Sequence, residues 1–252
     1  MHDYTIRQMN VFRNGKKIYG ELYMPDNDNC PITIISHGLN GTHEGSLDIA
    51  DEFAQNGIAA YIFDYCGGAS INMSDGKTTE MSVLTEARDL SAIIDEIKKI
   101  PQIDPTKIFL LGKSQGAYVS TIVATQRNGE VAGLVGLYPG YGLYDLVMEE
   151  MKKYGEIPER MEVMSVPLSD RYFKDILSFD IYEKMKRYYG NVLLIHGSED
   201  SIIPLYTAEK AAESFPHARL ITIEGAEHGF HGPERNEVIR LALDFIKKES
   251  GL

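Results

Sequence analysis

Apolar runs of strand length alternate with helical patterns along most of the chain, and this alternation limits the fold more than any other feature of the sequence. Six runs rich in β-branched and aromatic residues are expected to form buried strands: 32–36, 58–63, 107–111, 131–137, 191–195 and 219–223. Five helices are expected between and after them: 46–55, 80–100, 115–125, 204–214 and 234–248. This order predicts an α/β protein with a mostly parallel sheet covered by helices on both faces.

The N-terminus is expected to add a hairpin to this sheet. Residues 5–12 and 18–24 have strand character, and the Asn14-Gly15 pair between them is a strong turn signal. The predicted sheet therefore has eight strands. A chain of 252 residues is long enough to bury the core of one such domain, and 43% hydrophobic and 25% charged residues are ordinary values for a globular protein.

Charge and composition exclude several classes of partner. The net charge of −12 opposes binding to nucleic acid and to anionic membranes. The opening residues MHDYTIRQMN lack the apolar region of a signal peptide, and no run approaches the ~20 apolar residues that span a bilayer. We therefore expect a soluble, cytoplasmic protein. Cys30 and Cys66 have no zinc-like or CxxC spacing, so free thiols are expected, with no metal and no cofactor.

One long interval interrupts the alternation. About fifty residues separate the strand ending near 137 from the strand starting at 191, where a connection of a few residues is usual. The interval is rich in Tyr, Met and charged residues, and helices are expected at 144–154 and 170–177. We expect one domain, 1–252, with an inserted cap at about 141–187 that lies over the carboxyl edge of the sheet, where open α/β sheets bind ligands.

A serine stands at the junction between the strand at 107–111 and the helix at 115–125. Gly112-Lys113-Ser114-Gln115-Gly116 matches G-x-S-x-G, in which small neighbours allow a sharp turn that exposes the serine hydroxyl. By itself the motif also fits an ordinary strand-to-helix turn. A nucleophilic serine needs a base to take its proton and an acid to orient that base.

Both partners follow the next strands along the predicted sheet. Asp200 lies in the loop after the strand at 191–195, and His228 lies in the loop after the strand at 219–223. Taken singly, an Asp before a helix is usually an N-cap and a His in a Gly-rich loop is usually a surface residue. Their order, Ser, Asp, His, is nevertheless that of the α/β-hydrolase fold. Glu199 and His231 are the competing acid and base.

The loop after the strand at 32–36 supplies a further element. It reads His37-Gly38-Leu39-Asn40-Gly41, and Gly38 permits a close approach to the serine. The backbone N–H groups of Leu39 and Gln115 are expected to converge on the oxyanion that develops during acyl transfer.

These motifs resemble those of the serine α/β-hydrolases, from the strand at 32–36 to the C-terminal helix. HGLNG, GKSQG, HGSEDSIIP and GAEHGF, together with a compact cap, are similar to the bacterial cinnamoyl or feruloyl esterases. The resemblance implies a cofactor-free hydrolase of small-molecule esters, with Ser114 as nucleophile, His228 as base and Asp200 as orienting acid. Lys113 stands where those esterases usually carry His.

The cap is expected to influence substrate choice. Most of its Tyr and Met residues are expected only to seal the cap onto the sheet. By analogy with those esterases, Asp145 and Tyr172 are expected to contact a substrate hydroxyl, and Gly38 to border the bound ester. The same motifs also fit an acylaminoacyl-type peptidase, a thioesterase, or a binding protein on a degenerate hydrolase scaffold. The sequence allows a homodimer.

Overall fold

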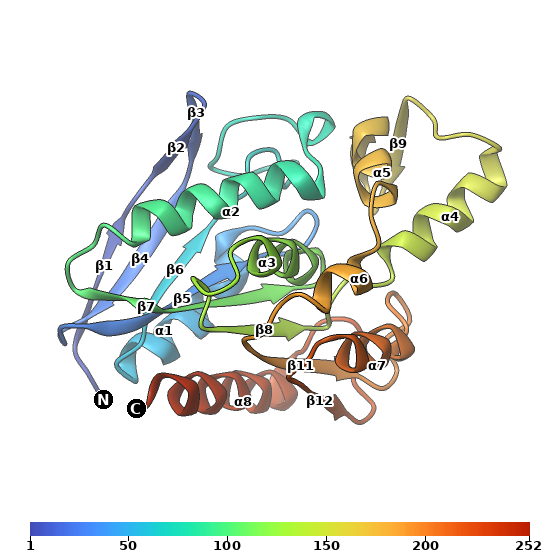
Figure 1. The fold of residues 1–252 in the computed structure, drawn as a ribbon. Helices are drawn as coiled ribbons and strands as arrows, with labels where there is room; N and C mark the ends of the chain where they lie inside the picture. Colours follow the sequence, from blue (N-terminus) through green and yellow to red (C-terminus); the bar gives the residue numbers. More distant parts are fainter.

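A single eight-stranded sheet forms the centre of the computed structural model, which describes all 252 residues. The strands run in the order β1-β4-β6-β5-β7-β8-β11-β12 (Figure 1). Their bounds, in that order, are Tyr4–Gln8, Gly20–Pro25, Ala59–Phe63, Cys30–Ser36, Ile103–Lys113, Gly133–Leu137, Asn191–Gly197 and Ala218–Ile223. β4 is antiparallel to β1 and β6, and every other pair is parallel. The expected fold class is confirmed.

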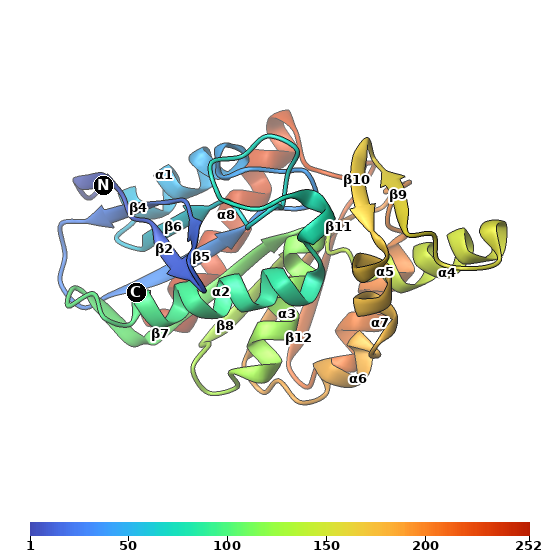
Figure 2. The same ribbon diagram turned by 90° about the horizontal axis from the view of Figure 1, so that it is seen from above.

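Helices cover both faces of this sheet. α1 (Leu47–Gln55) and α8 (Gly232–Ser250) pack on one face, while α2 (Val83–Ile97), α3 (Gln115–Gln126) and α7 (Leu205–Ser214) pack on the other (Figures 1 and 2). Each face has its own apolar cluster. Every residue of β5, β6 and β8 is buried, as expected for strands enclosed on two sides.

The N-terminal hairpin is divided between two sheets. β1 and β4 pair in the main sheet, whereas β2 (Val11–Arg13) and β3 (Lys16–Ile18) form a separate two-stranded ribbon. Asn14 and Gly15 close the ribbon with φ values of +50° and +78°, the conformation that an Asn-Gly turn favours. The chain leaves the main sheet at Met9 and returns at Gly20, and the Met9 N–H donates to the Gly20 carbonyl at 2.8 Å.

Helix α2 begins three residues later than expected. Ser82 is its N-cap: its hydroxyl accepts from the Thr85 N–H, and the Thr85 hydroxyl accepts from the Ser82 N–H in return. This reciprocal pair fixes the start of the helix. Residues Thr78–Glu80 form a separate 3-10 turn before it.

The interval expected as a cap projects beyond the carboxyl end of the sheet (Figures 1 and 2). It contains α4 (Leu143–Tyr154), β9 (Arg160–Val163), β10 (Val166–Ser169), α5 (Asp170–Leu177) and α6 (Ile181–Met185). α4 and α5 lie where helices were expected. The β9–β10 hairpin was not expected, because its turn residues Met164 and Ser165 both adopt positive φ, a conformation that Gly and Asn usually supply in such turns.

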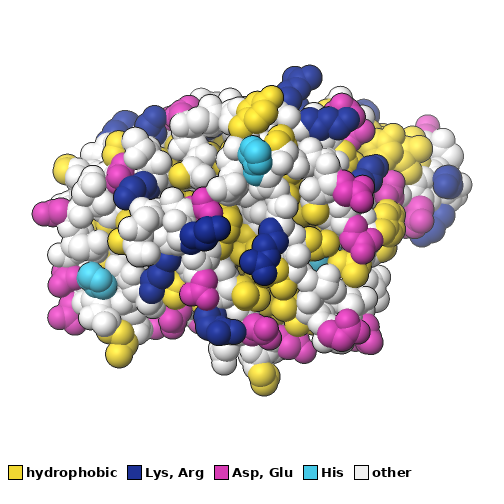
Figure 3. Space-filling model, turned by 60° about the horizontal axis from the view of Figure 1, so that its bottom comes forward, with side chains coloured by type: hydrophobic (Ala, Val, Ile, Leu, Met, Phe, Trp, Pro, Cys, Tyr) yellow, Lys and Arg dark blue, Asp and Glu magenta, His cyan; other side chains and the backbone are white.

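Acidic and basic side chains are interspersed on the face that bears α1 and α8, with no large patch of one sign (Figure 3). None of the helices is long and apolar enough to cross a membrane. Cys30 and Cys66 are both free and buried.

Candidate active site

Ser114 occupies a strained turn between β7 and α3. Its φ and ψ are +51° and −121°, outside the regions that L-residues usually adopt. The turn depends on the two flanking glycines. A Cβ on Gly112 would lie 2.4 Å from the backbone of Ala117, and one on Gly116 would lie 2.4 Å from the His37 carbonyl oxygen. The G-x-S-x-G pattern therefore has a steric basis, which is the usual geometry of a nucleophile elbow.

The structure brings Ser114, His228 and Asp200 together. His228 Nε2 lies 3.0 Å from Ser114 Oγ, and His228 Nδ1 lies 2.7 Å from Asp200 Oδ2. The imidazole is largely buried, and the ring of Tyr138 packs edge-on against it. Glu199 is exposed, and the carboxylate that bonds to His228 is that of Asp200; the exposed His231 lines the cavity at Ser114.

Asp200 is held by four hydrogen bonds. Its Oδ1 accepts from the N–H groups of Ile202 and Ile203 at 3.0 and 2.8 Å, and its Oδ2 faces both His228 and His196. Burial opposes ionisation of this carboxyl, but the hydrogen bonds from His196 and His228 outweigh burial and hold its pKa well below the usual range. Asp200 therefore carries the negative charge that an orienting acid needs.

His196 is a second histidine on this carboxylate that sequence reasoning missed. It is fully buried at the end of β11, with Nε2 3.1 Å from Asp200 Oδ2 and 2.8 Å from the Ile203 carbonyl oxygen. Both neighbours are acceptors, so Nε2 carries the hydrogen. Nδ1 is buried and has no partner. The only signal in the sequence was its place at the same strand end as Asp200.

The predicted oxyanion donors have N–H groups without a partner in the protein; Leu39 lines the cavity at Ser114, and Gln115 follows the serine directly. Leu39 N–H makes no hydrogen bond within the protein, and Gln115 N–H is the first of helix α3, where no intrahelical acceptor exists. Gly38 makes the approach possible, because a Cβ there would lie 3.0 Å from Ser114 Cβ. Gly38 thus borders the cavity through its backbone.

His37 fixes the conformation of this loop, a role that the sequence did not reveal. Its Nδ1 lies 2.7 Å from the Gly38 carbonyl oxygen, and its Nε2 accepts from the Tyr65 N–H at 3.0 Å. Burial lowers the pKa of His37 to about 4, so the ring is neutral near pH 7. One ring nitrogen can then donate while the other accepts.

The side chain of Gln115 connects the elbow to the cap. The Tyr172 hydroxyl of α5 donates to Gln115 Oε1 at 2.6 Å, and Gln115 Nε2 donates to Glu86 Oε2 of α2 at 2.8 Å. Glu86 is 1% exposed, and burial raises its pKa to about 8, so it is mainly protonated near pH 7. This buried chain lies directly behind a predicted oxyanion donor.

The two cap residues expected to bind substrate do not lie with the triad. Tyr172 is 2% exposed and its hydroxyl already donates to Gln115, so it has no free donor for a substrate. Asp145 is exposed on α4, accepts from the Tyr206 hydroxyl at 3.0 Å, and lines a different cavity of about 380 Å³. The expectation for both residues is corrected: their sequence position in the cap did not indicate which way the side chains face.

The triad opens into a cavity of about 290 Å³. The elbow, the loops after β5 and β12, and Met164 at the tip of the β9–β10 hairpin line it.

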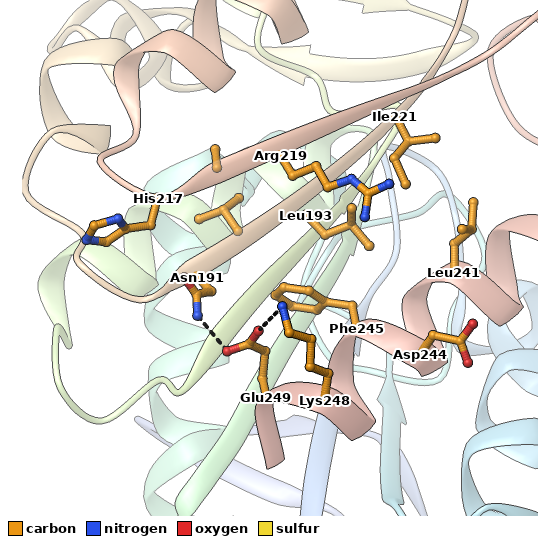
Figure 4. A pocket seen from close by; sticks show the side chains of 12 residues that line it. Asn191, Leu193, His217, Arg219, Ile221, Leu241, Asp244, Phe245, Lys248 and Glu249 are labelled. Carbon is orange, nitrogen blue, oxygen red and sulfur yellow. Dashed lines mark hydrogen bonds and ion pairs between the residues drawn. The ribbon is translucent and has the colours of Figure 1, made fainter. Parts of the chain in front are cut away.

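A cavity of about 420 Å³ lies between β11, β12 and α8 (Figure 4). The 420 Å³ cavity is lined by Asn191 and Ala218, the first residues of β11 and β12. It therefore lies at the strand ends opposite Ser114, away from the triad.

Two solved structures share this fold. Est1E from Butyrivibrio proteoclasticus, solved with ferulic acid, superposes with a TM-score of 0.84 at 21% identity, covering 95% of this chain and 96% of that one. The mouse alpha/beta hydrolase domain-containing protein 10 gives 0.79 at 20% identity, with 96% and 97% coverage. At these identities the likeness establishes the fold.

Sequence comparison adds the family. Palmitoyl-protein thioesterase ABHD10, mitochondrial, of Bos taurus is 28% identical over 189 residues, and its Rattus norvegicus counterpart is 27% identical over 215. The matches cover 69% and 79% of this chain but 57% and 69% of the relatives, so the chain spans little more than half of the bovine protein. The model of the prolyl oligopeptidase family matches residues 52–252. The chain therefore belongs to the prolyl oligopeptidase family and has the α/β-hydrolase fold.

Proposed function

We propose that the protein is a carboxylic-ester hydrolase that acts on small acyl esters through an acyl-enzyme. The hydrogen-bonded chain from Ser114 through His228 to Asp200 carries this proposal, because its distances of 3.0 and 2.7 Å suit proton transfer. The N–H groups of Leu39 and Gln115, which have no acceptor within the protein, lie next to this chain. A degenerate binding scaffold would not need to preserve all of these elements.

Each residue has one role in the proposed reaction. Ser114 Oγ attacks the ester carbonyl while His228 Nε2 takes its proton, and Asp200 stabilises the imidazolium that forms. The N–H groups of Leu39 and Gln115 stabilise the oxyanion, and losing one such donor typically costs about 3 kcal/mol. His228 then returns the proton to the leaving oxygen. Water attacks the acyl-enzyme by the same route and releases the acid.

The size of the cavity favours a small acyl group. About 290 Å³ lies at the lower end of the range for small-molecule sites. Esters of hydroxycinnamic acids are the first substrates to test, since the protein shares its fold with Est1E, which was solved with ferulic acid bound. Thioesters are the second candidate, because the mammalian sequence relatives are named palmitoyl-protein thioesterases. Aminoacyl amides are the third, in view of the family name.

A fluorophosphonate probe tests the proposal directly. Wild-type protein is expected to be labelled, and Ser114→Ala is expected to abolish labelling and to lower ester hydrolysis by about 10⁴-fold or more. Ser201→Ala, an exposed serine in the loop that carries Asp200, is the matched control and should be labelled like wild type. Labelling of Ser114→Ala at the wild-type rate would refute the assignment. Rates on methyl ferulate, short and long p-nitrophenyl esters, acyl-CoA and aminoacyl anilides then rank the substrates.

A further inference from the structure

The cavity at Ser114 is positively charged, although the protein as a whole is acidic. The chain carries a net charge of −12, yet no Asp or Glu lines the cavity. Its only fully cationic residue is Lys113, which lies next to Ser114 in the sequence. A cavity of this polarity is suited to a negatively charged ligand.

Lys113 is buried without an anionic partner. Its side chain sits at the end of β7, only 6% of the residue is exposed, and its Nζ donates to the Gly45 carbonyl at 2.6 Å. An ammonium group has three donors, so two have no acceptor in the protein. Gly45 also lines the cavity, which places the ammonium at its wall.

The nearby carboxylate is already paired with another cation. Asp48 accepts from two nitrogens of Arg235, and the same guanidinium donates to the Gly45 carbonyl at 2.9 Å. Lys113 and Arg235 therefore share one carbonyl, while Asp48 bonds to Arg235 and to the Ile49 N–H and acts on the Lys113 charge without direct contact. Burial and repulsion from Arg235 lower the pKa of Lys113 to about 8, and most molecules keep its charge at pH 7.

Such an arrangement is costly for the folded protein. Removing an ammonium from water without a counter-charge typically costs several kcal/mol. An apolar residue would fill the same space without that cost. A bound anion would satisfy the two free donors, so the arrangement is understandable as a binding feature.

The position of the cavity indicates which half of the substrate would carry the anion. His228 returns its proton to the leaving atom, so the leaving group must lie on the side of His228. Gly229 and His231, which follow His228, line the same cavity as Lys113, whereas the cap contributes only Met164. The ammonium therefore borders the leaving-group side.

We propose that Lys113 recognises an anionic group on the departing alcohol or thiol, so that preferred substrates are esters or thioesters whose leaving group carries a carboxylate or a phosphate. This inference rests on the proposed hydrolase function. It adds a specificity residue and a substrate class to that function.

A matched pair of esters tests the inference. 4-Acetoxybenzoate and its methyl ester have the same acyl group and differ in the charge of the leaving phenol. Wild-type kcat/KM is expected to favour the carboxylate, and Lys113→Met is expected to lower the ratio of the two kcat/KM values by about 10- to 100-fold, the usual effect of losing a charge-assisted hydrogen bond. Lys113→Arg should retain a preference for the carboxylate.

Two controls separate recognition from other effects. Lys210→Met removes a positive charge from the 380 Å³ cavity beside the cap and should leave the ratio as in wild type. An equal shift in Lys210→Met would mean long-range attraction and would overturn the proposal. An anion moved to the acyl side, in p-nitrophenyl hemisuccinate compared with p-nitrophenyl butyrate, should show no dependence on Lys113.

Folding defects do not obscure the outcome. The wild-type protein alone supplies a second measurement, because 4-hydroxybenzoate should inhibit hydrolysis more strongly than methyl 4-hydroxybenzoate. Equal inhibition, or equal losses on both esters in Lys113→Met, would show that Lys113 only supports the Gly45 carbonyl. If neither ester is hydrolysed by a protein that the fluorophosphonate probe also fails to label, the proposed function itself fails.

Discussion

The strand ends that precede Ser114 and Asp200 are buried on both faces, whereas helix α4 of the cap buries only Val147. Ser114, Asp200 and His228 each follow a strand end, so the parallel sheet fixes their relative positions. The cap instead buries apolar side chains from α5, α6 and β10 in the core cluster beneath it and adds a few polar links. The comparison teaches that catalytic atoms can be located from strand order, while the role of a cap residue depends on which neighbour its side chain meets.

Three hydrogen bonds show how the role of a cap residue depends on the neighbour that its side chain meets. Beside the link from Tyr172 to Gln115, Ser82 donates to Asp175 at 2.5 Å and Thr78 donates to the Pro167 carbonyl at 2.6 Å. All three join α5 or β10 to the segment around α2 or to the elbow. These bonds attach the cap on the side of Gln115.

The largest effect on activity is expected at Asp200, the acid that the order of the sheet strands identifies. Asp200→Asn should lower kcat/KM for p-nitrophenyl acetate by about 10³- to 10⁴-fold, because the neutral amide no longer holds the imidazole in the reactive tautomer. Glu199→Gln is the matched control and should keep wild-type kinetics. Thermal unfolding of both variants checks that the fold is intact. If Glu199→Gln is the damaging change, strand order has indicated the wrong acid.

An intermediate effect is expected at the join between sheet and cap. Tyr172→Phe removes one neutral hydrogen bond to Gln115, which is typically worth about 0.5–1.5 kcal/mol, or about 2- to 10-fold in kcat/KM. Because Tyr172 acts through Gln115, the loss should be equal for methyl ferulate and p-nitrophenyl acetate.

Tyr206→Phe is the control, since it removes a hydroxyl on α7 that bonds to Asp145 of the cap, away from the elbow. A loss in Tyr172→Phe that is confined to methyl ferulate would contradict this account. It would restore Tyr172 as a direct contact to a phenolic acyl group.

The last prediction concerns the stability of the fold, with a small effect expected at each step of pH. Glu86 has a pKa of about 8 in the folded protein but ionises near pH 4.5 when unfolded. The folded state therefore holds the proton more tightly, and stability is lost as the pH rises from about 4.5 to 8. The free energy of unfolding of wild type, relative to Glu86→Gln, should fall by up to about 1.4 kcal/mol per pH unit in this window. Urea unfolding at pH 5, 6, 7 and 8 measures the slope, and parallel curves would refute it.

The sequence predicted those elements whose determinants are local. β-rich runs located the core strands, and the steric demands of Gly112 and Gly116 located the elbow. The β9–β10 hairpin escaped prediction, because Met164 and Ser165 form its turn without Gly or Asn. His37 and His196 escaped for a different reason. Their roles depend on partners brought near only by the fold, as with the Tyr65 N–H, 28 positions from His37.

Because His37 and Glu86 are both neutral in the folded protein, the stability of the fold depends on pH in both directions. His37 resists protonation in the folded state, so stability is lost as the pH falls from about 6.5 to 4, while Glu86 makes it fall as the pH rises toward 8. These two groups thus favour a mildly acidic optimum for folding. Ionisation of Glu86 would also place a negative charge behind Gln115, beside the developing oxyanion. Alkaline solution should therefore weaken the fold and the transition state through one carboxyl group.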